Sequence, residues 1–357
     1  MGEKRDYTQR VLLYDPMFDE KMRNASENRY KSKWKRAVFV IFIVASVLAS
    51  IYFSFYSLER DRYAFKETEN GIMLSQFSGR ETDKVLYIDY LRDKDGNQPD
   101  TSKPVTQVRE YAINCNEYLN FIYISKTVEK IESTSFFTVN NLYGVFVEEG
   151  NEHYRVVDGV LYELENGQPV KAVFSPAKRA YVLAAEAVGA AVPQSPEQVE
   201  AFLKFCEDNA EEIDAAYEEY RYTVDLPDTV KVVGHLAFAY NEKLRKVVLH
   251  EGIVELEEMA LFRCSQMETV DFPSTLQKIG SDALSFCGEV KYIYIPAGVT
   301  EIGHHAFYNC GAEQIHMELS EEEADELVDF GDAWIPKKRN VIMKAVPVLY
   351  NQEKEVS

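Results

Sequence analysis

Residues 230–298 contain three consecutive copies of one 23-residue unit: VKVVGHLAFAYNEKLRKVVLHEG, IVELEEMALFRCSQMETVDFPST and LQKIGSDALSFCGEVKYIYIPAG. A fourth copy begins at Val299 and loses one residue before its last apolar segment. The same spacing separates Val105 from Val128 further upstream. A unit of this length cannot bury its apolar side alone, so successive units must stack and share one continuous core. The sequence therefore predicts a solenoid.

Each unit repeats the same residue types at the same places. Its first and fourth residues are branched aliphatics, its eighth is small and its ninth is large and apolar. Its eighteenth and twentieth residues are apolar and alternate with polar or variable neighbours, which is the period of a strand with one buried face. In the second of the three copies these positions are Ile253, Leu256, Ala260, Leu261, Val270 and Phe272.

The pattern V-x-x-I-G-x-x-A-F-x-x-C, followed by a strand and P-x-x-V, resembles the BspA-like class of leucine-rich repeats. The matching residues are Gly280, Ala283, Cys287, Ile293, Ile295, Pro296, Gly303, Ala306, Phe307 and Cys310. The segment 149–162, EGNEHYRVVDGVLY, resembles an edge motif of the same family. The resemblance covers residues 84–345 apart from one insertion. It implies a curved solenoid at a cell surface that adheres or binds a partner, and it carries over no catalytic residue.

The repeat stops between Pro176 and Tyr222. Residues 180–191 are rich in alanine, and Ser195-Pro196-Glu197-Gln198 has the form of a helix start with a capping box. We expect a helical pair there, either as a structural insert or as a dedicated partner site. The array is expected to end near Met317, where residues 320–328 would form a short acidic capping helix before a closing strand at 340–348.

Residues 37–57, AVFVIFIVASVLASIYFSFYS, carry no charge. As a helix this segment would span about 31 Å, which matches the hydrocarbon core of a bilayer. A buried helix or a cleaved signal peptide is the alternative, but the run is long and ends in bulky aromatics. Lys and Arg are concentrated before the segment, so we expect a cytoplasmic N-terminus and an extracellular C-terminal domain.

The chain has a net charge of −20, which argues against a nucleic-acid partner. Cys264, Cys287 and Cys310 recur at the twelfth position and are expected to be free thiols that fill the core. His304-His305 is best interpreted as part of a surface turn. The sequence holds no metal-site, phosphate-loop, dinucleotide or hydrolase motif, so we expect neither enzyme activity nor a cofactor.

If the eighteenth and twentieth residues point inward, the seventeenth and nineteenth point outward and include unusual aromatics. These form a candidate partner-binding face: Phe121, Tyr123, Phe146, Val248, Tyr292, Tyr294 and His316. Exposed tyrosines offer a broad apolar contact with a polar tip. Alternatively, the tails or the inserted helices cover these side chains, or cross-strand aromatic pairs only stabilise the sheet.

The sequence thus predicts an α/β leucine-rich-repeat solenoid with a helical insertion, preceded by one transmembrane helix. The expected segments are a cytoplasmic tail (1–36), a transmembrane helix (37–57), a stalk (58–83), an N-terminal repeat block (84–176), a helical insertion (177–221), a C-terminal repeat block (222–319) and a cap and tail (320–357). We expect a non-catalytic surface adhesion protein that binds a protein or glycan outside the cell. The alternative is a transmembrane receptor whose short tail docks a cytoplasmic partner.

Overall fold

The computed structural model describes residues 62–97, 99–113, 118–136, 139, 141–327, 329–330 and 348–349. Every described residue belongs to one compact unit, which lies within residues 61–357. The predicted tail and transmembrane segment lie outside the described residues. Among the helices of the described part, none has both the length and the apolar character needed to cross a membrane.

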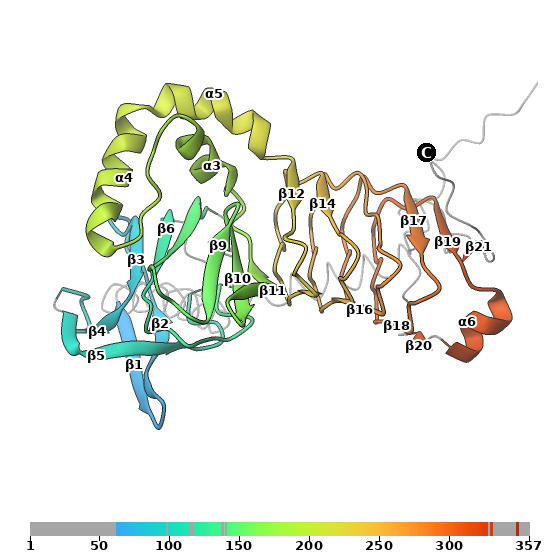
Figure 1. Ribbon diagram of the computed structural model, residues 1–357, viewed down its shortest axis with the longest axis horizontal. Coiled ribbons are helices and arrows are strands. Elements are labelled where there is room, and N and C mark those ends of the chain that lie inside the picture. Colours follow the sequence, from blue (N-terminus) through green and yellow to red (C-terminus); the bar gives the residue numbers. More distant parts are fainter. Residues whose placement is uncertain are drawn as a thin grey trace, which may run out of the picture. The chain divides into compact units, whose positions relative to one another are not determined.

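The C-terminal block is a stack of rungs, each contributing a short strand to one or both of two parallel rows (Figure 1). The first row contains β13 (Val232–Val233), β15 (Glu255–Leu256), β16 (Lys278–Ile279), β18 (Glu301–Ile302) and β20 (Asp329–Phe330). The second row contains β12 (Thr223–Asp225), β14 (Lys246–Val248), β17 (Tyr292–Ile295), β19 (Gln314–Met317) and β21 (Val348–Leu349). The stack confirms the predicted solenoid.

Strand pairing follows the sequence period. In the first row Glu255 pairs with Lys278, and Lys278 pairs with Glu301, in steps of 23 residues. In the second row Tyr292 pairs with Gln314, a step of 22. This shorter step falls in the unit that lacks one residue before its strand, so the predicted deletion is absorbed without disturbing the parallel ladder.

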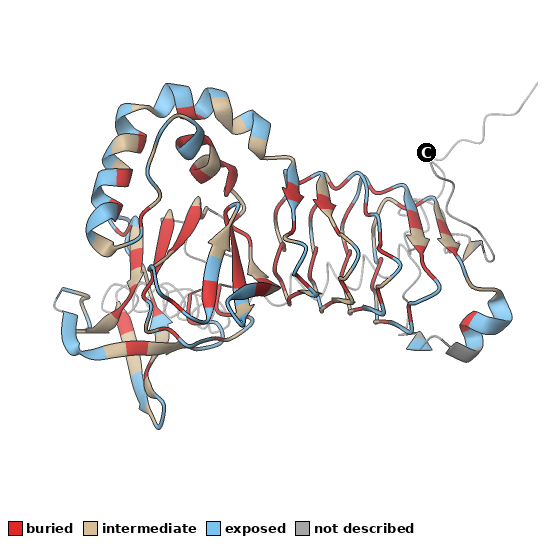
Figure 2. Cartoon of the chain, in the orientation of Figure 1, coloured by how far each residue is buried: buried red, intermediate tan, exposed pale blue. Residues whose placement is uncertain are grey.

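The core of this block consists of the repeated apolar positions, which appear as buried stripes along the strands in Figure 2. Ile253 and Leu256 are fully buried at the first and fourth positions, and Ile293 and Ile295 are buried at the eighteenth and twentieth. Their neighbours Tyr292 and Tyr294 face away from the core. The predicted inward and outward alternation is therefore confirmed.

The turns between the two rows carry the least expected backbone geometry. In each of four rungs the seventh and eleventh residues adopt positive φ angles without being glycine, for example Met259 at 55° and Arg263 at 60°. This conformation normally costs free energy for a residue with a side chain. Here it directs turn amides to the next rung: Met259 donates to the carbonyl of Ser281, and Arg263 donates to that of Ser285. Inter-rung hydrogen bonds therefore maintain the strained turns.

The N-terminal block begins earlier than predicted. Strands β1 (Tyr63–Thr68) and β2 (Gly71–Phe77) form an antiparallel hairpin within the segment interpreted as a stalk. Leu74 and Phe77 are buried in the core of this block, so this stretch is part of the folded domain. The remaining strands are β3 (Val85–Ile88), β4 (Tyr90–Arg92), β5 (Pro99–Val108), β6 (Phe121–Ile124), β7 (Lys130–Ile131) and β8 (Gly144–Val147).

This block also has two rows of parallel strands. Strand β2 pairs with β5, and β5 pairs with β7 through Gln107 and Lys130, again a step of 23. In the second row β3 pairs with β6 and β6 with β8, where Phe121 lies opposite Gly144. The two predicted units at Val105 and Val128 are therefore true rungs.

An antiparallel meander lies between the two cores. It consists of β9 (Tyr154–Val157), β10 (Val160–Glu165) and β11 (Gln168–Phe174). Leu161 is buried in the N-terminal core, whereas Tyr162 is buried in the C-terminal core. Strand β11 then pairs with β13 in parallel, so the meander begins the ladder of the second block.

The predicted edge motif fixes the entry to this meander. The side-chain amide of Asn151 donates to the carbonyls of Ser125 and Val128 at 3.0 and 3.2 Å. Its side-chain oxygen accepts the amides of His153 and Tyr154. The Tyr154 hydroxyl accepts the amide of Ile131 at 2.8 Å. No further rung of this block follows at this edge. Buried side chains therefore bind the backbone groups that the last rung would otherwise leave without partners.

The insertion contains three helices: α3 (Ala180–Ala187), α4 (Pro196–Asp208) and α5 (Ala210–Tyr220). The predicted capping box differs in detail. Ser195 makes no side-chain capping bond, and the Gln198 side chain accepts the amide of Gln194 instead. The predicted cap of α6 (Glu321–Leu327) is confirmed, because Ser320 and Glu323 exchange side-chain and amide hydrogen bonds.

Arg179 holds both ends of the insertion together. It lies directly before α3 and is almost fully buried. Its guanidinium donates to the carbonyls of Asp158 at 3.1 Å, of Tyr220 at 3.2 Å and of Thr223. Burial is the main reason that its pKa falls to about 10. One side chain therefore links the start of the insertion, its end and the turn between β9 and β10.

Replacing Arg179 with methionine should destabilise the protein by about 2–3 kcal/mol, because three partly buried hydrogen bonds to carbonyls are lost. Limited proteolysis should then cut first within 180–220. Arg155→Met is the matched control, since Arg155 is exposed on β9. Equal unfolding free energies for the two variants, measured in urea, would show that this link contributes nothing.

Adjacent rungs approach closely at the fifth position of three of the four units, where the residue is Gly234, Gly280 or Gly303. A Cβ on Gly280 would lie 2.5 Å from the backbone of Glu257 and Glu258, whereas a Cβ on Gly288 would meet its nearest atom at 3.7 Å. We expect Gly280→Ala to lower the unfolding free energy by about 1–3 kcal/mol, as overpacking does. Gly288→Ala should leave it nearly unchanged. Thermal unfolding of both variants tests this, and similar melting temperatures would refute the close-packing argument.

Candidate functional site

The N-terminal part of the candidate face is covered. Phe121, Tyr123 and Phe146 are 3%, 0% and 1% exposed, so the expectation that they form an open surface is wrong. The inserted helices pack on them, as Figure 1 shows for α3–α5 above β6. The ring of Phe202 from α4 lies 5.8 Å from that of Phe121 and 5.2 Å from that of Phe146. The alternative prediction, that the insertion covers the aromatics, holds for these three.

Gly144 makes this packing possible. It lies beside Phe121 on the outer side of the sheet, and a Cβ there would come within 2.5 Å of Val182 of α3. The helices can approach the strands closely because this position lacks a side chain. These outward aromatics therefore form a third hydrophobic core between sheet and helices.

The C-terminal part of the candidate face remains accessible. Tyr292 is 60% exposed, more than any other large hydrophobic residue in the described part of the chain. Val248, Tyr294 and His316 are partly exposed on the same outer side. Tyr294 lies opposite His316 in the ladder, so their side chains are direct neighbours across two strands. We call Val248, Tyr292, Tyr294 and His316 the outer-face patch.

Charged pairs border this patch on the earlier rungs. Lys246 lies 3.5 Å from Asp271, and Arg245 lies 3.5 Å from Glu268. The Arg245 guanidinium also stacks 4.1 Å from the centre of the Tyr222 ring. An aromatic centre with a polar, charged border is the composition that protein interfaces favour.

Cys264 and Cys287 fill the core as predicted, whereas the third repeated cysteine, Cys310, is only partly buried. Cys264 and Cys287 are fully buried and free, and their thiols donate to the carbonyls of Phe238 and Leu261 at 3.1 and 3.2 Å. Burial raises the pKa of Cys264 to about 12. In the preceding rung Asn241 donates to the same carbonyl of Phe238. Throughout the described ranges no three His, Cys, Asp or Glu residues are grouped in a way that could hold a metal ion.

Because a thiolate is the reactive form, Cys264 and Cys287 should resist alkylation by iodoacetamide at pH 8 in the folded protein. They should react completely after unfolding in urea. Peptide mass spectrometry follows each cysteine separately. Rapid native labelling of Cys287 would contradict its place in the core.

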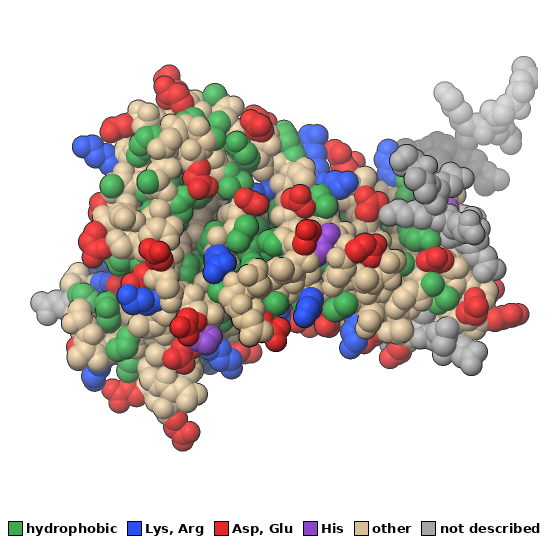
Figure 3. Space-filling model, viewed as in Figure 1, with side chains coloured by type: hydrophobic (Ala, Val, Ile, Leu, Met, Phe, Trp, Pro, Cys, Tyr) green, Lys and Arg blue, Asp and Glu red, His purple; other side chains and the backbone are tan. Residues whose placement is uncertain are grey.

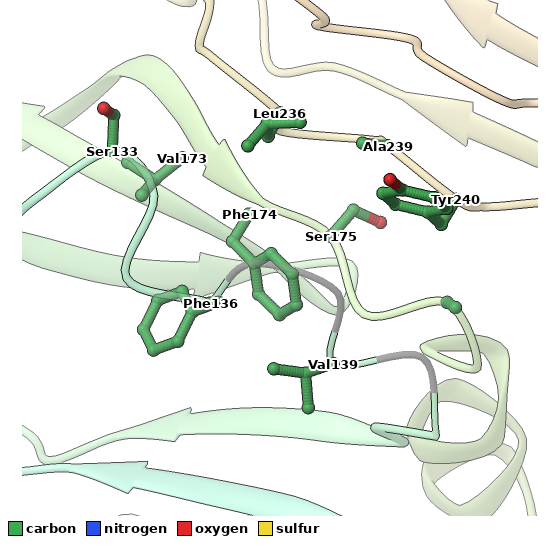
Figure 4. A pocket seen from close by; sticks show the side chains of 10 residues that line it. Ser133, Phe136, Val139, Val173, Phe174, Ser175, Leu236, Ala239 and Tyr240 are labelled. Carbon is green, nitrogen blue, oxygen red and sulfur yellow. The ribbon is translucent and has the colours of Figure 1, made fainter. Parts of the chain in front are cut away.

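A narrow crevice lies where the two blocks meet (Figure 4). Its walls are mainly apolar and include Phe136, Phe174 and Leu236, and its free volume is about 20 Å³. That space holds about one water molecule. The Ser175 hydroxyl lines the crevice and has no hydrogen-bond partner among the described residues, so it is the natural contact for such a water. The crevice is too small for an organic ligand.

A larger cleft lies where the insertion rejoins the C-terminal block. Its volume is about 580 Å³, and its walls come from the β9–β10 turn, α3, the end of α5 and β12. Four carboxylates line it: Asp158, Glu186, Glu219 and Asp225. No sequence motif indicates this cleft, because its carboxylates come from four separate elements.

An aromatic chain along the turns was also missed. The rings of Tyr240, Phe262, Phe286 and Tyr308 follow one another edge to face, with centres 5.5–5.6 Å apart. The Arg263 guanidinium lies 5.1–5.9 Å from three of them. These rings alternate between the eleventh and tenth positions of successive units, so no single repeat position revealed them. Their mutual contacts indicate a structural role between rungs.

One comparison with known protein families identifies the repeats. The model of the BspA type leucine rich repeat region matches residues 97–155 and 216–326 in six copies. Both matched ranges lie mainly in the repeat blocks, and the gap between them contains most of the meander and of the helical insertion. No curated protein matches the sequence significantly.

Comparison with solved structures gives matches whose TM-scores lie below 0.5. A leucine rich cell surface protein from Faecalibacterium prausnitzii is 18% identical with a TM-score of 0.47, and the match covers 76% of this chain and 60% of that one. The pneumococcal vaccine antigen PcpA is 13% identical with a TM-score of 0.42, covering 71% and 81%. A leucine-rich repeat protein from Bacteroides ovatus is 15% identical with a TM-score of 0.31, covering 77% and 66%.

Proposed function

The repeats of this chain belong to the BspA-type leucine-rich-repeat family, and on that basis we propose that it is a non-catalytic interaction protein displayed at a cell surface. Its partner, a protein or a glycan outside the cell, would bind the outer-face patch of the C-terminal block. The single observation that carries this proposal is the exposure of Tyr292 on a strand whose equivalent aromatics in the N-terminal block are buried. Large aromatics are common anchors in protein interfaces.

Two features support the choice of this surface over the rest of the solenoid. The outer-face patch combines tyrosine and histidine, whose apolar bodies contact a partner while their polar tips bind water or partner groups. The patch is also built on hydrogen-bonded strands, which hold its side chains in place before binding. A rigid, preorganised surface loses less conformational entropy on association than a loop does.

The surface display rests on the charge-free segment 37–57 and on the excess of Lys and Arg before it. We propose that this segment anchors the chain with its N-terminus in the cytoplasm. Membranes from cells expressing the full chain should retain it after alkaline carbonate washing, and external protease should remove residues beyond 62. Recovery of the full chain in the soluble fraction would contradict the anchor.

Replacing Tyr292 and Tyr294 with serine should abolish partner capture, because the patch loses most of its apolar area. The melting temperature should change little, since Tyr292 contributes little to the core. The measurement compares capture of a partner, identified by mass spectrometry, by cells displaying the variant or the original chain.

Tyr118→Ser is the matched control, because Tyr118 is 42% exposed but lies outside the patch. It should capture the partner normally. If the double variant unfolds, the patch is structural instead; if it folds and binds normally, the partner uses another surface.

A second candidate function is transmembrane signalling. The observation that favours it is an apolar cluster in the predicted cytoplasmic tail, RVLLYDPMF at residues 10–18. Such a cluster on a short polar tail is suited to docking an inner partner. Deleting residues 2–28 separates the two functions, since simple display should retain partner capture and cell adhesion, whereas a receptor should lose its intracellular response.

A further inference from the structure

The second strand row of the N-terminal block ends in an edge at β3. Strand β3 pairs in parallel with β6 and with no other strand in the described part of the chain (Figure 1). Alternate residues of a strand direct their amide and carbonyl groups toward opposite neighbours. The carbonyls of Lys84 and Ile88 accept amides from residues at the two ends of β6. The backbone groups of Val85 and Tyr87, which alternate with these residues, therefore point away from β6.

These outward backbone groups are not used within the described ranges. Neither the amide nor the carbonyl of Val85 or Tyr87 bonds to a described residue on the side away from β6. The two side chains are half-buried and pack on the core beneath the insertion, so the strand is held in place. Lys84, directly before the strand, is exposed. A fixed strand with a row of unpaired backbone groups is a template for a further strand.

Other edge strands of this block are protected against such pairing. Strand β1 has a shift in its register with β2 and carries the charged residues Lys66 and Glu67. Strand β4 also has a register shift, against β5, and carries Arg92. Bulges and charged side chains are common means of blocking an edge. Strand β3 has the sequence VLYI in regular register with β6, so neither means blocks its edge.

The outward groups of β3 are complementary to a second copy of the same strand. In an antiparallel pair, two residues that face each other can exchange both of their backbone hydrogen bonds. When a two-fold axis passes beside Leu86, Val85 of one copy faces Tyr87 of the other, and the reverse pair forms by symmetry. Every outward amide of both strands then meets an outward carbonyl. A symmetric dimer requires such reciprocal pairs.

We propose that the β3 edge is a dimerisation surface, at which two copies of this chain pair their β3 strands in antiparallel fashion around Leu86. The β3–β6–β8 rows of the two copies then form one continuous sheet. Pairing over 4 residues contributes only a small part of the ~1,200–2,000 Å² that stable interfaces bury, so association is weak and depends on concentration. This surface is separate from the outer-face patch and does not depend on the function proposed for it.

Sedimentation velocity of the full chain in detergent, over a range of protein concentrations, measures the dimer. Val85→Pro removes an outward amide at the first residue of β3, where proline is tolerated because β6 does not use that amide. It should weaken dimerisation about tenfold, because one hydrogen bond per copy is lost. Val85→Ala is the matched control, since it shortens the same side chain but keeps the amide. It should weaken dimerisation by no more than about threefold.

Photochemical crosslinking gives a second measurement that does not rely on the proline variant. Lys84→p-benzoylphenylalanine places a reactive group at the exposed start of β3, which the antiparallel pair brings beside Ile88 of the other copy. Mass spectrometry of a mixture of nitrogen-15-labelled and unlabelled chains distinguishes crosslinks between copies from crosslinks within one copy.

The outcomes separate edge pairing from other ways of associating. Crosslinks between copies near Ile88, together with a larger loss for Val85→Pro than for Val85→Ala, support the inference. If Val85→Pro does not fold, as its melting curve would show, the crosslinks alone decide. Equal dimerisation of two folded variants, crosslinks only within one copy, or a monomer at every concentration overturns the inference.

Discussion

The lateral fit of one rung on the next is the constraint on which the rest of the structure depends. A single rung buries little apolar surface by itself. Its turns contain non-glycine residues in a left-handed conformation that isolated chains avoid. Its amides and carbonyls are satisfied only when the next rung lies in register. Glycines such as Gly280 and Gly303 allow the backbones to approach closely enough for those bonds. The stack therefore forms only when strand register, turn conformation and glycine positions are all correct together.

The same constraint explains what happens at the ends of each block. A terminal rung would expose unpaired backbone groups and apolar side chains. Asn151 and Tyr154 bind such groups at the end of the N-terminal block, and the meander covers its core on one side. The other side of the meander starts the second core, so a single three-stranded element ends one stack and begins the next.

The repeat architecture was predictable because its signal is local and periodic. Residues such as Ile253 and Leu256 recur at fixed spacing, so their burial and strand register follow from the sequence alone. The repeat spacing did not predict which outward-facing side chains remain exposed. Tyr123 and Tyr294 occupy equivalent positions with the same side chain, yet only the former lies under the insertion. The difference arises from contacts between segments far apart in the chain.

Long-range contacts also account for the other features that the sequence did not reveal. Arg179 donates hydrogen bonds to carbonyls of residues up to 44 positions away. No sequence motif predicts which backbone carbonyls will accept such a bond. The acidic cleft gathers residues from four elements, and Figure 3 shows acidic side chains spread widely over the visible surface, so their density alone identifies no site. The hairpin at 63–77 lacks the repeat spacing although it completes a core.

The insertion therefore decides which part of a long repeated surface remains available. It packs on the N-terminal row and leaves the C-terminal row accessible at Tyr292. Hydroxyl-radical footprinting of the full chain, read by mass spectrometry, tests this division directly. The account predicts rapid oxidation of Tyr292 and slow oxidation of Tyr123 and Phe146. Equal oxidation rates at Tyr123 and Tyr292 would contradict it.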